Sequence, residues 1–315
     1  MFIRAELHNH TIHSDGALTP EQLAQYAQDH EFQVIALTDH NTASGQEEMQ
    51  AMISQHNMDL SLIKGIEMTT YYGHVLGLGM TRMIDFSDLD PRHPEPFFVS
   101  MRKNGARAIG LAHPFCIGKP IMVGCRFEME VHDWSLIDYI EIYNTSAQSN
   151  DSSVSDECFF TGNGQAVDFW KEKVLQGYRL AAVTGKDIHK APEDNDVIIT
   201  FCEVDEKDMR PNSEKVLSSI LTQRTMVTKG PLIELKQDQD KVKIHFEPSG
   251  YHAWKSLPEG SFTLKMTSDN GNIIEQMVNL HQDYTVLIEN AHVTIFELFG
   301  GNDRIAIARP LYWRT

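Results

Sequence analysis

Histidine and carboxylate side chains recur at positions where they can bind metal ions. His8 and His10 end a first apolar, β-branched run, and residues two apart in an extended chain face the same way. Both imidazoles can therefore reach one metal ion. Asp39 and His40 close a second such run, and Glu67 follows a third. The pattern predicts metal ligands at the ends of strands.

The remaining candidate ligands lie in the same kind of place. Asp15 is in the loop after the first run, and His74, His113, Asp187 and His189 begin or follow later runs. In βα barrels the loops at the carboxyl ends of the strands converge on one face, so distant donors become neighbours. Imidazole and carboxylate donors suit zinc, manganese or iron better than calcium or magnesium. We therefore expect a transition-metal centre at that face.

Short apolar runs alternate with amphipathic segments from residue 1 to about 224, which is typical of βα units. Gln22 follows Thr19 by three residues, and Glu47 follows Ser44 by three residues. Two helices are therefore expected to begin at capping boxes. The alternation favours a parallel sheet or barrel. Strands are expected at 2–7, 33–38, 61–66, 74–78, 106–112, 139–143 and 180–184, and further helices near 95–104, 164–176 and 212–223.

The pattern changes beyond about Thr225, where period-two runs are joined by tight turns. Asn270-Gly271 and residues 300–303 are predicted to be hairpin turns. We expect residues 225–315 to form a small antiparallel β-sandwich after a domain of residues 1–224.

Charge and composition bound the class of protein. The chain of 315 residues has 27 Lys and Arg against 44 Asp and Glu, a net charge of −17, which argues against binding duplex nucleic acid through a broad basic surface. No apolar run approaches the roughly 18 residues of a membrane span. The N-terminal residues lack the apolar core of a signal peptide, and the four cysteines form no Cys-x-x-Cys pair. We expect a cytoplasmic protein with free thiols and no membrane partner.

These motifs together resemble the PHP (polymerase and histidinol phosphatase) metal-dependent hydrolases. The resemblance implies a distorted (βα)7-type barrel. The motifs that carry it are His8-x-His10 with Ser14-Asp15-Gly16, Thr38-Asp39-His40-Asn41-Thr42, Gly65-x-Glu67, His113-Pro114 and Asp187-x-His189. The shorter motifs Gly73-His74, Glu141-Ile142-Tyr143-Asn144 and 227–231 resemble the branch that contains carbaryl hydrolase.

The resemblance also implies two to three divalent ions of manganese, zinc or iron. Such ions lower the pKa of a bridging water, supply a hydroxide near neutral pH and clamp the oxygens of an ester. Three ions bring about +6 and three carboxylates return about −3, so the pocket favours an anionic substrate. The ligands carried over are His8, His10, Glu67 and Asp187 for one ion, a bridging Glu67 with His74 and His113 for a second, and Asp15, His40 and His189 for a third.

We therefore expect a phosphoesterase that hydrolyses a small organic phosphate ester with a metal-bound hydroxide. The alternative is a carboxylic or carbamate ester hydrolase that uses the same ions. A third alternative, a metal-binding sensor without catalysis, is disfavoured by the intact set of donors. The expected partner is a small-molecule phosphate or ester, with no duplex nucleic acid, and formation of a homo-oligomer is left open.

Three further residues are candidates for catalysis or substrate contact. Asp39 directly precedes a ligand and is expected to accept a proton from a ligating imidazole, with the role of catalytic acid as its alternative. Lys186, where the family has a small residue, either contacts substrate or points outward. Asn144 ends a strand together with Glu141 and Tyr143, and these side chains either bind substrate or hold the loop.

Some charged residues near the motifs can also be interpreted as ordinary surface-loop residues. His13 is interpreted as an exposed loop residue, because His10 and Asp15 already fill the expected positions. Lys119 and Arg126 follow His113 in a loop, where a cation either grips a phosphate or simply lies on the surface.

Overall fold

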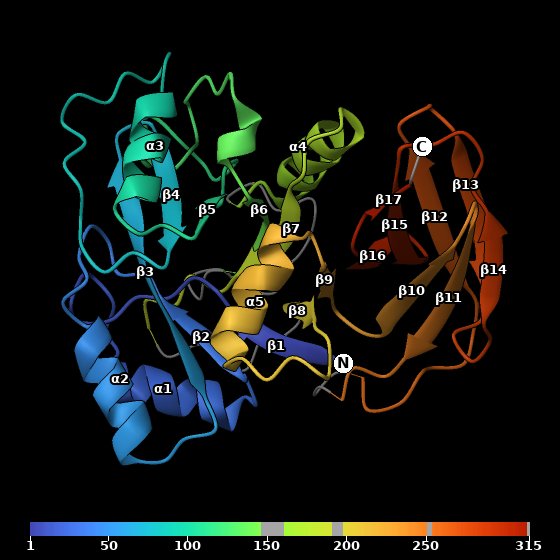
Figure 1. The fold of residues 1–315 in the computed structure, drawn as a ribbon, viewed down its shortest axis with the longest axis horizontal. Coiled ribbons are helices and arrows are strands. Elements are labelled where there is room, and N and C mark those ends of the chain that lie inside the picture. Colours follow the sequence, from blue (N-terminus) through green and yellow to red (C-terminus); the bar gives the residue numbers. More distant parts are fainter. Residues whose placement is uncertain (146–160, 191–197, 251–253, 314–315) are drawn as a thin grey trace.

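A mixed sheet runs through the whole protein, as the computed structural model in Figure 1 shows. The structure describes residues 1–145, 161–190, 198–250 and 254–313. Fourteen strands make up the sheet, in the order β13-β12-β15-β16-β9-β8-β1-β2-β3-β4-β5-β6-β7, with β17 paired to β15. The expected mixture of helices and strands is confirmed. Cys158 lies outside the described residues.

The N-terminal part carries the helices, which lie around the strands on the left of Figure 1. Its strands are β1 (Phe2–Glu6), β2 (Val34–Leu37), β3 (Ser61–Thr70), β4 (Gly73–Leu78), β5 (Ala108–Leu111), β6 (Tyr139–Asn144), β7 (Ala181–Gly185), β8 (Ile199–Glu203) and β9 (Thr225–Thr228). Its helices are α1 (Pro20–Asp29), α2 (Gln46–Gln55), α3 (Glu95–Lys103), α4 (Asn163–Leu175) and α5 (Asn212–Leu221), with a 3-10 turn at Trp134–Leu136.

The two predicted capping boxes have different outcomes. At α1, Thr19 accepts a hydrogen bond from the Gln22 amide and the Gln22 side chain accepts one from the Thr19 amide, as predicted. At α2 the prediction is wrong, because Gly45 is the N-cap and no side chain caps the helix. The Ser44 hydroxyl instead lies 2.9 Å from Nδ1 of His13. A tertiary contact has replaced the local one.

Strand direction departs from a purely parallel sheet. The β1-β2-β3 and β5-β6-β7 ladders are parallel, whereas β4 is antiparallel to both neighbours and β8 is antiparallel to β1 and β9. Within the described chain, β7 forms its backbone ladder with β6, and it meets β8 and β9 through Thr200 and Thr225 hydroxyls at 2.7 Å from the Thr184 amide and the Ala182 carbonyl. A closed (βα)7 barrel therefore stays a prediction.

Apolar side chains from both faces of the strands fix the helices. Ile3 and Leu7 of the β1 segment belong to the cluster that packs against Val216 and Ile220 of α5. A second cluster covers α1 and α2, and a third covers α3 and α4. Among the described residues, no helix is long and apolar enough to cross a membrane.

The C-terminal part is built of antiparallel strands, on the right of Figure 1. Asn270-Gly271 joins β12 to β13 and residues 300–303 join β15 to β16, so both predicted hairpins are confirmed. A separate three-stranded sheet has the order β10-β11-β14. The strands are β10 (Leu232–Asp238), β11 (Lys241–Glu247), β12 (Phe262–Ser268), β13 (Ile273–Val278), β14 (Tyr284–Leu287), β15 (Val293–Gly300), β16 (Asp303–Ile307) and β17 (Leu311–Tyr312).

The two parts of the chain are joined by pairing and by buried charge. β9 pairs with β8 on one side and with β16 on the other. The fully buried Glu297 on β15 accepts from Lys171 of α4 at 2.6 Å and from Arg304 at 3.0 Å. The predicted boundary at residue 225 therefore falls at the start of a strand that both parts share. The division into two domains and the β-sandwich remain predictions.

Candidate metal centre

Backbone hydrogen bonds beyond the strand ends bring the first and last candidate ligands together. Asn9 forms a parallel bridge with Ile188, so the chain after β1 runs beside the chain after β7. The Asp187 amide donates to the His8 carbonyl at 2.9 Å, and the His10 amide donates to the Ile188 carbonyl at 3.0 Å. These bonds set His8 and His10 next to Asp187, although the residues are far apart in sequence.

A second bridge sets the middle ligands beside the first. His40 pairs with Glu67, and the Glu67 amide donates to the Thr38 carbonyl at 3.1 Å. On the other side of β3, Thr69 lies opposite His74 in the antiparallel ladder with β4. The β3-β4 hairpin thus returns the chain to the ligand-bearing end of the sheet.

All nine candidate ligands lie in four overlapping groups of donors. Within each group, one donor atom of every residue lies within 4.8 Å of the others. The groups come from residues 8–189, and the described residues beyond Thr225 add none. They are His10, Asp15, His40 and His189; His8, His113 and Asp187; His8, His10 and Glu67; and His40, Glu67 and His74.

Glu67 lies at the centre of these groups. Its side chain is fully buried, and the two carboxylate oxygens face different histidines. Oε2 lies 3.1 Å from His8 Nε2, 3.2 Å from His10 Nε2 and 2.9 Å from His40 Nδ1, while Oε1 lies 2.9 Å from His74 Nδ1 and 3.3 Å from His113 Nε2. Two oxygens with separate sets of neighbours suit a carboxylate that bridges two ions.

The two aspartates link the remaining histidines. Asp187 Oδ1 lies 3.1 Å from His10 Nε2 and 3.3 Å from His189 Nδ1. Asp15 Oδ1 lies 3.3 Å from His189 Nε2 and 3.4 Å from His40 Nε2. Asp15 is exposed, so this end of the cluster opens to solvent.

Several of these buried atoms have no hydrogen-bond partner, which is unusual for polar groups inside proteins. They are His8 Nε2, His10 Nε2, Glu67 Oε2 and Asp187 Oδ1. Each of these atoms faces a nitrogen or oxygen atom of another candidate metal ligand. Divalent cations among imidazole nitrogens and carboxylate oxygens would satisfy all four, so the residues fit a metal centre.

The pKa values of these groups reflect their mutual attraction. Burial disfavours the charged imidazole of His10, but the nearby carboxylates of Asp187 and Glu67 outweigh it and raise its pKa to about 9. The pKa of His113 is likewise raised to about 9 against the effect of burial, chiefly by Glu67. Burial opposes the charge of Glu67 too, yet His8 and His74 hold the pKa of this carboxyl well below its usual range. The ion-free centre therefore holds protons that metal ions would displace.

Glu141 supports two ligands without belonging to a donor group. It lies on β6, and its Oε1 is 2.8 Å from His8 Nδ1 while its Oε2 accepts from the His113 amide at 2.9 Å. At Gly185 a Cβ atom would lie 2.1 Å from Glu141 Oε1, so only glycine leaves room for this carboxylate. The role predicted for Glu141 from the sequence is to bind substrate or to hold the loop. The available signal in the sequence was a carboxylate in the last part of a predicted strand, since the candidate ligands also lie at strand ends.

Asp39 has a different task from the predicted one. Its buried carboxylate accepts from the Thr11 amide at 2.6 Å, from the Thr11 hydroxyl at 2.8 Å and from the Ser14 hydroxyl at 2.7 Å. It thus holds the loop between His10 and Asp15. The structure places the imidazole contact expected of Asp39 at Glu141 instead.

Asn144 and Lys186 are both buried beside ligands. The Asn144 amide donates to Asp187 Oδ2 at 3.2 Å, which fits a residue that orients this carboxylate. The Lys186 amide donates to Glu6 at 2.9 Å, and its ammonium lies 6.0 Å from the centre of the Tyr26 ring on α1. A direct contact of Lys186 with substrate remains a prediction.

Two ligands have strained backbones. His113 and Asp187 have φ values of 29° and 52°, in a region that residues other than glycine rarely adopt. Such strain concentrates at functional sites, where surrounding structure holds it in place. The Glu141 bond to the His113 amide and the Asn144 bond to Asp187 are contacts of this kind.

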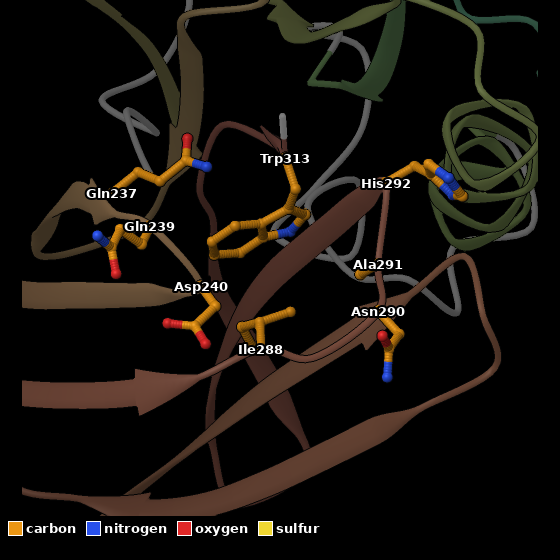
Figure 2. A pocket seen from close by; sticks show the side chains of 8 residues that line it. All are labelled: Gln237, Gln239, Asp240, Ile288, Asn290, Ala291, His292 and Trp313. Atoms are coloured by element: carbon orange, nitrogen blue, oxygen red, sulfur yellow. The ribbon is translucent and has the colours of Figure 1, made fainter. Parts of the chain in front are cut away.

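A hollow lies in the C-terminal part, away from the donor groups. It has a volume of about 1000 Å³. Figure 2 shows the Trp313 ring facing Ile288, whereas the His292 side chain points away from the others. The His292 imidazole lies 2.9 Å from Asp269, and the Trp313 indole donates to Thr294 at 2.9 Å. The hollow contains none of the four donor groups, so the metal centre is the candidate site.

Parts of the chain are similar to known proteins. Residues 6–150 match the family model of the PHP domain. The chain is 37% identical over 79 residues to the 5′-3′ exoribonuclease Rnm of Escherichia coli (strain K12), which is 24% of this chain and 27% of that protein. It is 35% identical over 81 residues to a 5′-3′ exoribonuclease of Haemophilus influenzae, which is 24% of this chain and 29% of that protein. The match thus spans between a quarter and a third of these curated relatives.

A solved structure shows the same fold over nearly the whole chain. It is a two-domain protein from Bacteroides vulgatus ATCC 8482 that contains a predicted PHP-like metal-dependent phosphoesterase. The TM-score is 0.56 at 16% identity, and the likeness covers 99% of this chain and 95% of the other. At this identity the likeness shows the fold, and the match of residues 6–150 to the PHP domain supports the predicted metal-dependent hydrolase.

The predicted partners need a correction. A small-molecule phosphate or ester and no duplex nucleic acid were expected, but the curated relatives are exoribonucleases, which act on nucleic acid. The prediction weighed the net charge of −17 of the whole chain. That charge governs binding of a duplex along a broad surface, whereas a strand end that enters a pocket responds to the local field of the pocket.

Proposed function

We propose that this protein is a metal-dependent phosphodiesterase that removes nucleotides from the 5′ end of single-stranded RNA. The observation that carries the hydrolase chemistry is the convergence of nine imidazole and carboxylate side chains on a few buried, unsatisfied atoms. The names of the relatives support the substrate and the direction. Manganese, iron or zinc suits these donors.

The residues divide the work between holding ions and orienting ligands. When bound, two or three divalent ions would activate a water molecule and neutralise the phosphate. Glu67 would bridge two ions through its two oxygens, and Asp187 would join its neighbouring histidines. Glu141 fixes the His8 ring, so that Nε2 of His8 points at the centre.

Local charge favours a phosphate at this site. Asp15, Glu67 and Asp187 are the three carboxylates of the donor groups, and they offset about half of the charge of three divalent ions. A pocket with a net positive field attracts an anionic strand end even in an acidic protein. The exposed Asp15 lies at the open end, where a strand would enter.

The test is a degradation assay with the full chain, freed of metal and then loaded with Mn²⁺. The substrates are a linear 24-nucleotide RNA with a 5′ phosphate and a 3′ label, the same RNA in circular form, and an aryl carboxylic ester. We expect mononucleotide release from the linear RNA, an intact circle and no ester hydrolysis. Chelator abolishes the activity and Mn²⁺ restores it.

Each alternative outcome has a defined meaning. Cleavage of the circle would show an endonuclease and contradict the need for a 5′ end. Hydrolysis of the aryl ester alone would favour the carbaryl-hydrolase-like branch that the short motifs 227–231 and Gly73-His74 suggested. An inactive protein with full metal occupancy on all substrates would refute the proposal.

We further propose a functional division of the chain at about residue 225. The N-terminal part supplies the candidate ligands, and the C-terminal strands, through the shared strand β9 and the Glu297 ion pairs, hold α4 in place.

A further inference from the structure

An exposed tyrosine lies on the hairpin that joins two predicted ligands. Tyr71 is in the turn between β3, which carries Glu67, and β4, which carries His74. The side chain of Tyr71 is 72% exposed, whereas the neighbouring Tyr72 packs against the apolar core. The turn therefore presents one aromatic ring to solvent between the strands that carry two candidate ligands.

The turn that holds Tyr71 is well ordered by hydrogen bonds. The Thr70 hydroxyl donates to the Gly73 carbonyl at 2.8 Å and accepts from the Tyr72 amide at 3.0 Å. The Tyr72 carbonyl accepts from the Glu128 amide at 2.7 Å. Because these hydrogen bonds restrict the backbone of the turn, less conformational entropy is lost when a ligand stacks on the Tyr71 ring.

A second loop lies directly against this turn. At Gly124, a Cβ atom would lie 2.7 Å from the Thr70 carbonyl oxygen and 3.6 Å from Tyr71 Cα. The three residues before Gly124 are Ile121, Met122 and Val123, with exposures of 68%, 42% and 53%. This loop begins after the candidate ligand His113, so both segments lead from the metal centre to one apolar rim.

The rim also carries a cation. Arg126 is exposed two residues after Gly124, and its guanidinium lies 5.6 Å from the centre of the Phe115 ring. Aromatic and apolar groups beside a cation match a nucleotide, which has a flat base and an anionic phosphate. Exposed apolar groups gathered at one place mark a binding surface more often than chance.

We propose that Tyr71 is a stacking platform for the base of the 5′-terminal nucleotide of RNA, with Ile121–Val123 as the facing apolar wall. This inference rests on the proposed exoribonuclease function and names the part of the substrate that the rim recognises. The phosphate enters the metal centre and the base stays outside, on the ring of Tyr71. Because every base has a flat face, the platform binds without sequence preference.

The test compares two RNAs that differ only in the 5′-terminal base. One is a linear 5′-phosphorylated RNA, and the other has an abasic 5′-terminal nucleotide. Stacking on an aromatic side chain predicts that the wild-type protein prefers the normal RNA about tenfold or more in kcat/KM. Tyr71→Ala should lose this preference because kcat/KM falls for the normal RNA and stays unchanged for the abasic RNA. Tyr71→Trp should keep the preference.

A matched control removes an exposed apolar side chain elsewhere. Met277 on β13 is 63% exposed, and Met277→Ala should retain the wild-type preference. Equal preference in Tyr71→Ala and wild type would overturn the inference and leave the proposed function standing. Hydrolysis of neither RNA by the wild-type protein would refute both. A changed oligomeric state of Tyr71→Ala with unchanged preference would assign the rim to a protein interface instead.

Discussion

Nδ1 of His8 lies 2.8 Å from Oε1 of Glu141, and the opposite nitrogen of the same ring points at Glu67. A carboxylate behind a ligating histidine fixes the ring orientation and its tautomer, and it makes the imidazole a stronger donor. The other oxygen of Glu141 holds the His113 amide. One buried side chain thus orients two ligands on different strands.

Replacing Glu141 with Gln should weaken metal binding without removing a ligand. The amide keeps the shape of the carboxylate but loses its charge, so His8 is held less firmly. Loss of such support commonly costs about 10- to 100-fold in metal affinity. Competition with a fluorescent chelator measures the affinity, and Glu130→Gln, an exposed carboxylate nearby in sequence, should bind as the wild type does. Unchanged affinity in Glu141→Gln would exclude a positioning role.

Glu67→Gln should have a larger effect, because Glu67 is placed to bridge two ions. Loss of an anion between two dications raises their mutual repulsion, so RNA hydrolysis should fall by roughly 10³-fold or more and metal content should drop. His13→Ala is the control, since its imidazole contacts Ser44 and Glu48 and lies outside the donor groups. Elemental analysis and the RNA assay check both variants. A Glu67→Gln protein with full occupancy and a near wild-type rate would disprove the bridge.

Metal binding should release protons near neutral pH. In the ion-free protein the pKa values of His10 and His113 are raised to about 9, so both rings are charged at pH 7 and must lose a proton to bind a metal. Affinity for Zn²⁺ should therefore rise with pH and level off above about 9. Calorimetric titration in buffers of different ionisation enthalpy measures the protons released, and no release at pH 7 would contradict the prediction.

The same raised pKa values fix the pH dependence of stability without metal. A histidine pKa raised by folding stabilises the folded state most below its unfolded value, about 6.5. That contribution disappears as the pH rises through about 9, where the folded-state rings of His10 and His113 lose their protons. The ion-free protein should thus lose stability between these values, while bound metal opposes the loss.

The sequence alone predicts most of the site, because ligands at strand ends follow from a local pattern. His8 and His10 have the spacing of an extended chain, and the convergence of nine donors needs only the ends of strands to meet. Their contacts with one another come from bridges such as Asn9 with Ile188. The pairing of segments so far apart in the chain cannot be predicted from a local pattern in a single sequence.

The misses have a common physical origin in tertiary contacts. The β3-β4 hairpin turns through two residues, and its antiparallel direction is invisible in a run of apolar residues. The local spacing of Ser44 predicts a capping box, but the Ser44 hydroxyl instead contacts His13 from another segment. Asp39 directly precedes the candidate ligand His40 in sequence, but Glu141 makes the imidazole contact from a different strand.

The shared strand β9 makes the two parts of the chain one cooperative unit. A fragment that ends at residue 224 leaves the outer edge of β8 without its hydrogen-bonded partner, and open strand edges recruit other chains into aggregates. It also leaves the Lys171 ammonium of α4 without Glu297. Calorimetry of the whole protein should then record a single unfolding transition, with the strands beyond β9 melting together with the metal centre rather than before it.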